Sequence, residues 1–236
     1  MTKARKRVVA LISGRGSNLA ALIEAAKEPA YPAEIVGVVS NVADAQGLEA
    51  ARQQGFDTRA VTKADHSGRE ALDAATDEAI REMGADIVVM AGYMRLIGSG
   101  FAEKWAGRMI NIHPSILPLF KGLDTHARAL EAGMRVHGCS VHFVTAEMDG
   151  GPVIAQAVVP VLPDDDAERL SRRVLRAEHR LYPHALRLVA EGRARMEAGR
   201  TVYSGVAEGE RDLLISPATE RLPEAADLES LARFTP

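Results

Sequence analysis

Residues 8–26 read VVALISGRGSNLAALIEAA, and this stretch predicts the fold class. Its first part, 8–13, is a short apolar and β-branched run of the kind found in strands that are buried on both faces. A glycine loop follows, and beyond it the apolar residues recur at three- and four-residue spacing, as they do on one face of a helix. A strand, a glycine loop and a helix in this order form the first unit of a parallel α/β sheet.

The same alternation continues along the chain. Further strands are expected at 35–40, 58–61, 87–91 and 109–112, and helices at 18–26, 47–54, 68–83 and 99–106. Two long extended runs, 136–145 and 152–161, predict a hairpin-like pair with a wide loop. An acidic start at 164–166 is expected to cap a helix that ends near Ala190. Together these elements predict an α/β fold with a Rossmann-like, mainly parallel twisted sheet flanked by helices.

Length and composition favour one domain that acts on small molecules. The chain has 236 residues, 47% of them apolar, which suffices for one substantial core. We expect a catalytic domain over 1–204 and a C-terminal extension over 205–236. The formal net charge of -3 gives no reason to expect a nucleic-acid partner.

The cysteine count and the hydropathy pattern bear on the compartment. With one cysteine, Cys139, no internal disulfide can form, so a reducing cytoplasmic compartment is expected. The basic run before Val8 is not followed by an apolar region long enough for a signal peptide. No stretch of about 18 apolar residues could span a membrane. The sequence does not determine the oligomeric state, and a homodimer remains one alternative.

The first glycine loop is a candidate phosphate site. A dinucleotide-binding loop needs a third glycine where Leu19 stands and an acid at the end of the second strand, where Ser40 stands. A lysine followed by Ser or Thr, as in nucleotide-triphosphate loops, is also missing. The loop therefore suits one terminal phosphate on the amides of Gly16, Ser17 and Asn18. The alternative is that the glycines serve only the geometry of the turn.

The strand at 109–112 ends in a pair of residues suited to catalysis. Asn111 and His113 are two positions apart, so they face the same side at the carboxyl end of a parallel strand. This pair suits transfer of a formyl group to an amine, because the amide can hold an oxyanion and the imidazole can move a proton. The alternative is a structural histidine at the end of a strand.

Asp149 lies in the wide loop and is followed by Gly150, Gly151 and Pro152. The freedom of the glycine backbone allows this carboxylate to point inward, and we expect it to face His113. An ionised carboxylate in that place favours the protonated imidazole and keeps a proton donor available. The alternative is a turn aspartate bonded to its own backbone.

The remaining histidines predict no metal site. His137 and His142 are five residues apart on an extended run, so they point to opposite faces. Cys139 could share a face with His137, but two ligands do not make a zinc site. His126 either lines the pocket or begins the helix that follows it. We expect Cys139 to be a buried, small apolar residue.

Five segments carry a resemblance to a known family. They are LISGRGSNL at 11–19, VVMAGYMRLI at 88–97, GRMINIHPSILP at 107–118, HGCSVHFVTAEMDGGPVI at 137–154 and RVLRAEHRLYP at 173–183. The chain resembles, over residues 8–202, the folate-dependent phosphoribosylglycinamide formyltransferases of purine biosynthesis. A phosphate loop, an Asn-x-His-Pro-Ser strand end and an Asp-Gly-Gly-Pro loop in this order make the resemblance specific.

The resemblance implies two small-molecule substrates, glycinamide ribonucleotide and 10-formyltetrahydrofolate as the co-substrate, and no metal. It assigns catalysis to Asn111, His113 and Asp149, and the ribonucleotide to Gly16, Ser17, Asn18 and Glu178. It assigns the folate to Arg69, Met94, Arg95, Leu96, Ile97, Asn111, Thr145, Ala146, Glu147, Met148 and Asp149. The apolar members suit a flat aromatic ring, and the two arginines suit the glutamate tail.

Three residues depart from the pattern of the bacterial relatives. Arg15 stands where Asn is common, Asp124 where His is common, and Leu175 where Gln is common. Arg15 adds positive charge beside the phosphate loop, whereas Leu175 removes a polar contact on the substrate side. None of the three belongs to the proposed catalytic trio.

Two related enzyme families and a binding protein without catalysis are the alternative functions. Formyltetrahydrofolate deformylases share the strand-end residues but use water as the acceptor and carry an amino-terminal regulatory domain, whereas the first strand here begins near Val8. Methionyl-tRNA formyltransferases add a C-terminal RNA-binding barrel, which the residues after Val161 are too few to form. A binding protein without catalysis would be expected to lose the trio, and all three residues are present.

Overall fold

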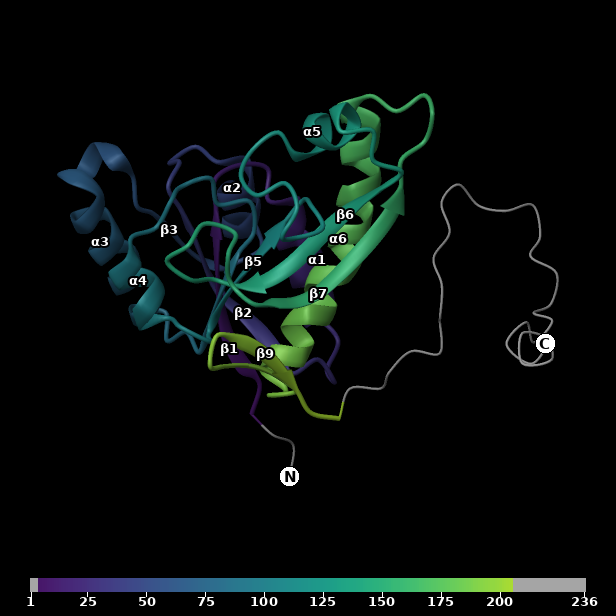
Figure 1. Cartoon of the computed structure of the whole chain (residues 1–236). Coiled ribbons are helices and arrows are strands. Elements are labelled where there is room, and N and C mark those ends of the chain that lie inside the picture. The colour runs from purple at the N-terminus through teal and green to yellow at the C-terminus, as the bar shows by residue number, and fades with distance from the viewer. Residues whose placement is uncertain (1–3, 206–236) are drawn as a thin grey trace, which may run out of the picture.

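A computed structural model describes residues 4–205 as one seven-stranded sheet with helices on both sides (Figure 1). The strand order is β3-β2-β1-β4-β5-β6-β7. The strands are β1 (Lys6–Ile12), β2 (Ala33–Ser40), β3 (Asp57–Ala60), β4 (Ile87–Met90), β5 (Met109–His113), β6 (Val136–Phe143) and β7 (Val153–Pro160). β1 to β5 are parallel, and β6 is antiparallel to both β5 and β7. The predicted α/β fold class is therefore confirmed.

The helices cover the two faces of the sheet unequally. They are α1 (Ser17–Ala26), α2 (Gln46–Gln53), α3 (Gly68–Glu82), α4 (Ser99–Lys104), α5 (Thr125–Glu131) and α6 (Ala167–Ala190), with a short 3-10 turn at Lys63–Asp65. Alternate residues of β1 enter two separate cores: Val8 and Ala10 pack on the side of α1, α2 and α6, and Val9 and Leu11 on the side of α3 and α4 (Figure 1). A strand buried on both faces explains the continuous apolar run at the start of the chain.

The predicted elements are confirmed, with ends that move by no more than two residues. The helix expected at 99–106 ends at Lys104, because the chain tightens there and Gly107 takes a left-handed conformation, φ 71°. A small hairpin, β8 (Ala194–Glu197) and β9 (Arg200–Tyr203), was not predicted. Its four-residue strands give too little periodicity to recognise, although Ala198 and Gly199 both have the positive φ of a tight hairpin turn.

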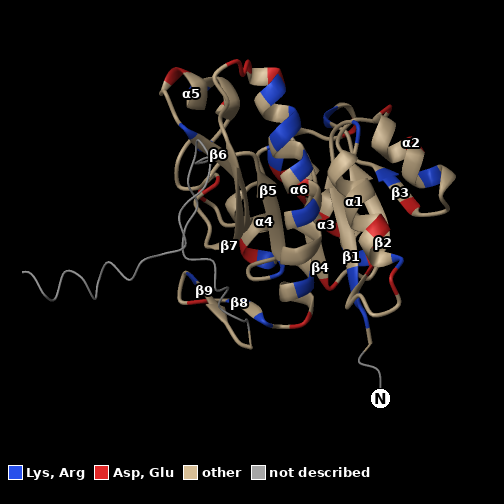
Figure 2. Ribbon diagram, turned by 90° about the vertical axis from the view of Figure 1, so that its right-hand side faces the viewer, with Lys and Arg blue, Asp and Glu red and all other residues tan. Residues whose placement is uncertain are grey.

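Helix α6 begins as its acidic start predicted. The side chain of Asp166 accepts a hydrogen bond from the backbone N–H of Arg169 at 2.7 Å, which caps the helix. Asp165 holds the guanidinium of Arg173 through both carboxylate oxygens, at 2.6 and 2.9 Å. The arginines of α6 lie along its length in Figure 2. Asp165 and Asp166 therefore stabilise the first turns of α6, and no separate role for them is required.

The predicted C-terminal extension and the predicted lack of membrane-spanning segments can be compared with the described residues only in part. Of the expected extension over 205–236, all but Gly205 lies outside the described residues. Within residues 4–205, none of the helices combines the length and the apolar character that crossing a lipid bilayer requires.

The hydroxyl of Tyr182 links α6 to the centre of the sheet. Tyr182 is fully buried, and its hydroxyl lies 3.0 Å from the carbonyl oxygen of Met90 and 3.2 Å from that of Ile110. We expect Tyr182→Phe to lower the free energy of unfolding by about 1 kcal/mol, because a buried hydrogen bond is lost without a change in shape. Urea denaturation with an unchanged m value would measure it.

The matched control is Tyr203→Phe. The Tyr203 hydroxyl donates to the carbonyl oxygen of Ile154 at 2.6 Å, but 46% of the residue is exposed. Water can replace this bond, so a loss of less than about 0.5 kcal/mol is expected. Equal losses in the two variants would show that the buried position of Tyr182 confers no added stability.

Candidate active site

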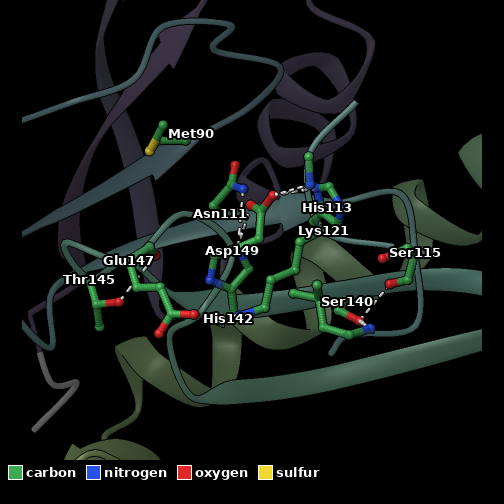
Figure 3. Close-up of polar contacts among 12 residues, drawn as sticks. Met90, Asn111, His113, Ser115, Lys121, Ser140, His142, Thr145, Glu147 and Asp149 are labelled. Carbon is green, nitrogen blue, oxygen red and sulfur yellow. Dashed lines mark hydrogen bonds and ion pairs between the residues drawn. The ribbon is translucent and has the colours of Figure 1, made fainter. Parts of the chain in front are cut away.

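Three side chains converge where the parallel strand β5 ends. Asn111 and His113 lie on β5, and Asp149 lies in the loop between β6 and β7 (Figure 3). His113 is 6% exposed, and its Nδ1 is 3.4 Å from Oδ2 of Asp149. The spacing of two along β5 and the return of the chain through β6 bring together an amide, an imidazole and a carboxylate.

The environment of Asp149 favours its ionised form. Burial raises the pKa of this carboxyl, but the nearby imidazole of His142, the backbone N–H of Gly122 and the charge of His113 outweigh burial. The pKa of Asp149 therefore lies below its ordinary value. The N–H of Gly122 donates to Oδ2 at 2.9 Å. Asp149 also has a left-handed backbone, φ 50°, which is uncommon for a residue other than glycine.

His142 is a member of this site that the sequence reasoning missed. Its Nε2 is 3.2 Å from Nδ2 of Asn111 and 3.7 Å from Oδ1 of Asp149 (Figure 3). Nδ1 of His142 is 2.9 Å from the carbonyl oxygen of Phe143, which can only accept, so Nδ1 carries a proton. Nε2 lies between the Asn111 amide and Oδ1 of Asp149, so one ring nitrogen links the amide to the carboxylate. The signal lay in the strand pairing, which sets Asn111 directly opposite His142.

The first glycine loop lies at the start of α1. Gly16 caps the helix with φ 74°, and a Cβ added to it would lie 3.0 Å from the Cα of Gly47. The N–H of Gly47 also donates to the carbonyl oxygen of Gly14 at 2.9 Å. Close packing therefore favours glycine at 16 and 47, which agrees with the geometric alternative for Gly16. The first amides of a helix have no acceptor within the helix, so those of Ser17 and Asn18 remain suited to an anion.

Asn18 and Glu178 form a buried pair behind this loop. Nδ2 of Asn18 donates to Oε2 of Glu178 at 2.7 Å, although 160 residues separate them in the sequence. Oδ1 of Asn18 is buried and has no hydrogen-bond partner among the described residues 4–205. A buried acceptor without a partner is costly, and a donor from a bound substrate would satisfy it.

The charge of Glu178 lowers stability at neutral pH. Burial raises the pKa of Glu178 by more than the hydrogen bond from Asn18 lowers it. The native state thus binds more protons than the unfolded state between the ordinary and the raised pKa, so stability falls as the pH rises through this window. We expect Glu178→Gln to raise the melting temperature at about pH 7.5, with a gain that shrinks toward about pH 4.

Thermal unfolding at a series of pH values measures this effect. Glu168→Gln is the matched control, since Glu168 is an exposed acid at the start of the same helix. A Glu178→Gln protein that is less stable than the unchanged protein at neutral pH would contradict the burial penalty.

The residues assigned to the folate fall into an exposed group and a paired group. Met94, Leu96 and Met148 are large apolar residues that are 69%, 56% and 51% exposed, so they offer apolar surface to a flat ring. The guanidinium of Arg95 is bound to Asp73, and its Nε lies 3.3 Å from the Tyr93 hydroxyl.

The paired arginine changes the expectation for the glutamate tail. Arg95 is largely neutralised by Asp73, whereas Arg69 is exposed at the start of α3 and has no ion pair among residues 4–205. Arg69 is therefore the better candidate to hold a carboxylate. Ile97 packs against the core on the side of α3 and α4.

The other assigned loop residues lie beside Asp149. Thr145 Oγ1 donates to the carbonyl oxygen of Glu147 at 3.4 Å, and the Glu147 side chain binds Nζ of Lys121 at 2.6 Å. Thr145, Ala146, Glu147 and Met148 are partly or fully exposed, so this segment is open to a ligand.

Two further histidines, His126 and His137, contact each other. As predicted, His137 and His142 point to opposite faces of β6: His137 packs edge-on against the ring of His126, at 5.3 Å between centroids. Burial lowers the pKa of His137 to about 4. Cys139 is fully buried, and burial raises the pKa of its thiol to about 12. Residues 4–205 contain no group of His, Cys, Asp or Glu placed to hold a metal ion.

The three departures occupy different places. Arg15 is exposed in the glycine loop, and Leu175 is half-buried on α6. Asp124 precedes α5 with φ 55°, but its side chain caps no N–H group of that helix. Arg15 is therefore the departure best placed to add charge near the phosphate loop.

Comparison with known proteins connects this geometry to one family. A family model described as formyl transferase matches residues 6–186. Phosphoribosylglycinamide formyltransferase of Escherichia coli (strain K12) is 47% identical over 198 residues, covering 84% of this chain and 93% of that protein. The trifunctional purine biosynthetic protein adenosine-3 of Bos taurus is 48% identical over 200 residues. That match covers 84% of this chain but only 20% of the bovine protein, so the chain spans about a fifth of the length of such trifunctional relatives.

Solved structures show the same fold. Glycinamide ribonucleotide transformylase 1 from Symbiobacterium toebii superposes with a TM-score of 0.81 at 47% identity, covering 84% of this chain and 94% of that one. A formyltetrahydrofolate deformylase from Pseudomonas syringae pv. tomato superposes with a TM-score of 0.77 at 29% identity, covering 84% of this chain and 66% of that one. The fold is thus shared by a protein named as a transformylase and by one named as a deformylase.

Proposed function

Because the chain belongs to the formyl transferase family, we propose that it transfers the formyl group of 10-formyltetrahydrofolate to the amine of 5'-phosphoribosylglycinamide, also called glycinamide ribonucleotide. The product is N-formylglycinamide ribonucleotide, an intermediate of de novo purine biosynthesis. The supporting observation is that Asn111, His113 and Asp149 converge at the end of β5.

The acceptor side of the proposal rests on the glycine loop. The amides of Gly16, Ser17 and Asn18 would hold the phosphate, and Glu178 with Oδ1 of Asn18 would meet ribose hydroxyls. These groups fit a phosphorylated sugar because they offer amide donors at one end and buried acceptors at the other.

The formyl donor would lie on the opposite side of the trio. Met94, Leu96 and Met148 supply apolar surface for its ring, and the loop 145–149 would wrap that ring. Arg69 would hold a carboxylate of the tail, since its charge is not neutralised by a partner among the described residues.

The proposed mechanism is direct transfer between the two bound substrates. The uncharged amine attacks the formyl carbon, and Nδ2 of Asn111 and the protonated His113 stabilise the oxyanion that forms. A water held by Asp149 carries the proton released by the amine to the leaving nitrogen as its bond to the formyl carbon breaks. Each group moves once, so no covalent enzyme intermediate is needed.

A deformylase remains the second candidate, because a protein of that name shares the fold. It needs the same trio but uses water in place of the amine. Within residues 4–205, no side chain caps the start of α1 and Oδ1 of Asn18 has no partner, which favours a phosphorylated acceptor, for which a deformylase has no use.

A spectrophotometric assay of the purified protein with 10-formyltetrahydrofolate, with and without glycinamide ribonucleotide, distinguishes the candidates. Folate release only in the presence of the ribonucleotide is the expected result. Release without it would favour the deformylase. No release under either condition would refute both enzymes and leave a protein that binds without catalysis.

A further inference from the structure

The turn formed by Phe120, Lys121 and Gly122 contacts both ionisable members of the trio. The carbonyl oxygen of Phe120 lies 3.0 Å from Nε2 of His113, and the N–H of Gly122 donates to Asp149 at 2.9 Å. This turn lies between β5 and α5, whereas Asp149 lies between β6 and β7. One short segment thus sets the surroundings of His113 and Asp149 together.

The contact to Phe120 determines where His113 carries its proton. A carbonyl oxygen has no hydrogen to donate, so Nε2 of His113 must be the donor. The neutral ring then has its lone pair on Nδ1, the nitrogen that faces Asp149 at 3.4 Å. From this we infer that Phe120 is a positioning residue, whose backbone carbonyl keeps one proton on Nε2 and confines proton exchange to Nδ1 of His113.

The backbone of Phe120 adopts an unfavourable conformation to make this contact. Its φ is 56°, in the left-handed region that costs an L-residue other than glycine roughly 1–2 kcal/mol. Neighbouring contacts hold it there. The hydroxyl of Ser115 donates to the carbonyl oxygen of Leu119 at 2.6 Å, and the guanidinium of Arg128 donates to that of Lys121 at 2.7 Å. The Phe120 ring packs edge-on against His137, with 5.9 Å between centroids.

A second contact ties the turn to the loop of Asp149. Nζ of Lys121 is 2.6 Å from Oε1 of Glu147, two residues before Asp149. Both side chains are partly exposed, so the pair contributes little stability by itself. Its location matters more, because it joins the two loops beside the Gly122 hydrogen bond. The turn at 120–122 is thereby joined to the loop that carries Asp149, and the ring of His113 contacts both segments.

A fixed proton on Nε2 has a consequence for catalysis, which rests on the proposed function. If Nε2 keeps its proton throughout, the N–H at Nδ1 of protonated His113 is the one left to hydrogen-bond the oxyanion, and the ring need not turn. The opposite tautomer would present a hydrogen on Nδ1 in the neutral ring and leave a lone pair facing the Phe120 carbonyl, which is repulsive.

The direct test is nitrogen NMR of the ring in the full-length protein without substrates. Long-range correlations in the 15N-labelled protein, with His113→Gln to identify the His113 signals, show which nitrogen is protonated once titration has made the ring neutral. A proton on Nε2 is expected. A neutral ring with its proton on Nδ1 would overturn the inference. The spectrum does not depend on turnover, so a failure of the proposed function would be distinguished from a failure of this one.

Two substitutions isolate the backbone of Phe120 from its ring. Phe120→Gly removes the ring but permits the left-handed conformation, so the Nε2 proton should persist in the spectrum. Phe120→Pro also removes the ring but fixes φ near −65°, and it should lower kcat by about tenfold or more and populate the other tautomer. A proline variant that retains the pure Nε2 tautomer would refute the role of the carbonyl. If that variant does not fold, the unchanged protein and Phe120→Gly still decide, since loss of the Nε2 proton in either contradicts the inference.

Discussion

Replacement of His113 by alanine is expected to lower turnover by about a hundredfold or more, with little change in the binding of the ribonucleotide. His113 is buried at the end of β5, and its Nδ1 faces Asp149. In the proposed mechanism its proton stabilises the oxyanion only while the transition state forms, so its loss should reduce kcat rather than raise KM. The groups assigned to the phosphate lie at the start of α1, on another element than this ring.

Steady-state kinetics with both substrates, together with direct binding of the ribonucleotide, would measure this effect. His184→Ala is the matched control, because His184 is an exposed histidine on α6. Its turnover should stay within about twofold of the unchanged protein, as for a surface substitution remote from the site. Near-normal turnover in His113→Ala would remove this residue from the mechanism.

Asp149→Asn is expected to have the second large effect, again about a hundredfold or more in turnover. The substitution keeps the shape of the side chain but removes the negative charge that faces Nδ1 of His113 at 3.4 Å. An asparagine can still accept the hydrogen bond from the Gly122 N–H through its amide oxygen, so the loop is expected to keep its course. The loss should therefore reflect charge and proton transfer rather than folding.

Thermal unfolding alongside kinetics separates these causes. Asp164→Asn is the control, since Asp164 is exposed before α6 and its side chain makes no hydrogen bond or ion pair among residues 4–205. The control should retain full activity. A low activity of Asp149→Asn that comes with a large loss of stability would contradict the proposed role and point to a structural one.

Local features of the sequence predicted much of the fold and part of the site. The two-residue spacing of Asn111 and His113 placed them on one face of a strand, and the alternation of strands and helices placed that strand in a parallel sheet. The acidic start of α6 predicted its cap, because capping depends on residues only three positions apart. The small β8–β9 hairpin escaped prediction because its strands are too short to show a period.

Residues distant in sequence set the rest of the site. Asn18 and Glu178 are 160 residues apart, and no local pattern indicates that one donates to the other. His142 joins Asn111 only through the register of two antiparallel strands, and a shift of one residue would turn it to the other face. Arg95 has the charge expected of a carboxylate ligand, but Asp73, on another element, already binds it.

The sequence by itself determined the fold class, the strand that carries Asn111 and His113, and the loop that carries Asp149. These features depend on periodicity and on residue types that are close together in the chain, so they can be recognised without the tertiary structure. The tertiary structure alone decided that the carbonyl of Phe120 meets Nε2 of His113, and that the same turn holds Asp149. A hydrogen bond needs its two atoms within about 3 Å, and only the packing of separate loops brings them that close.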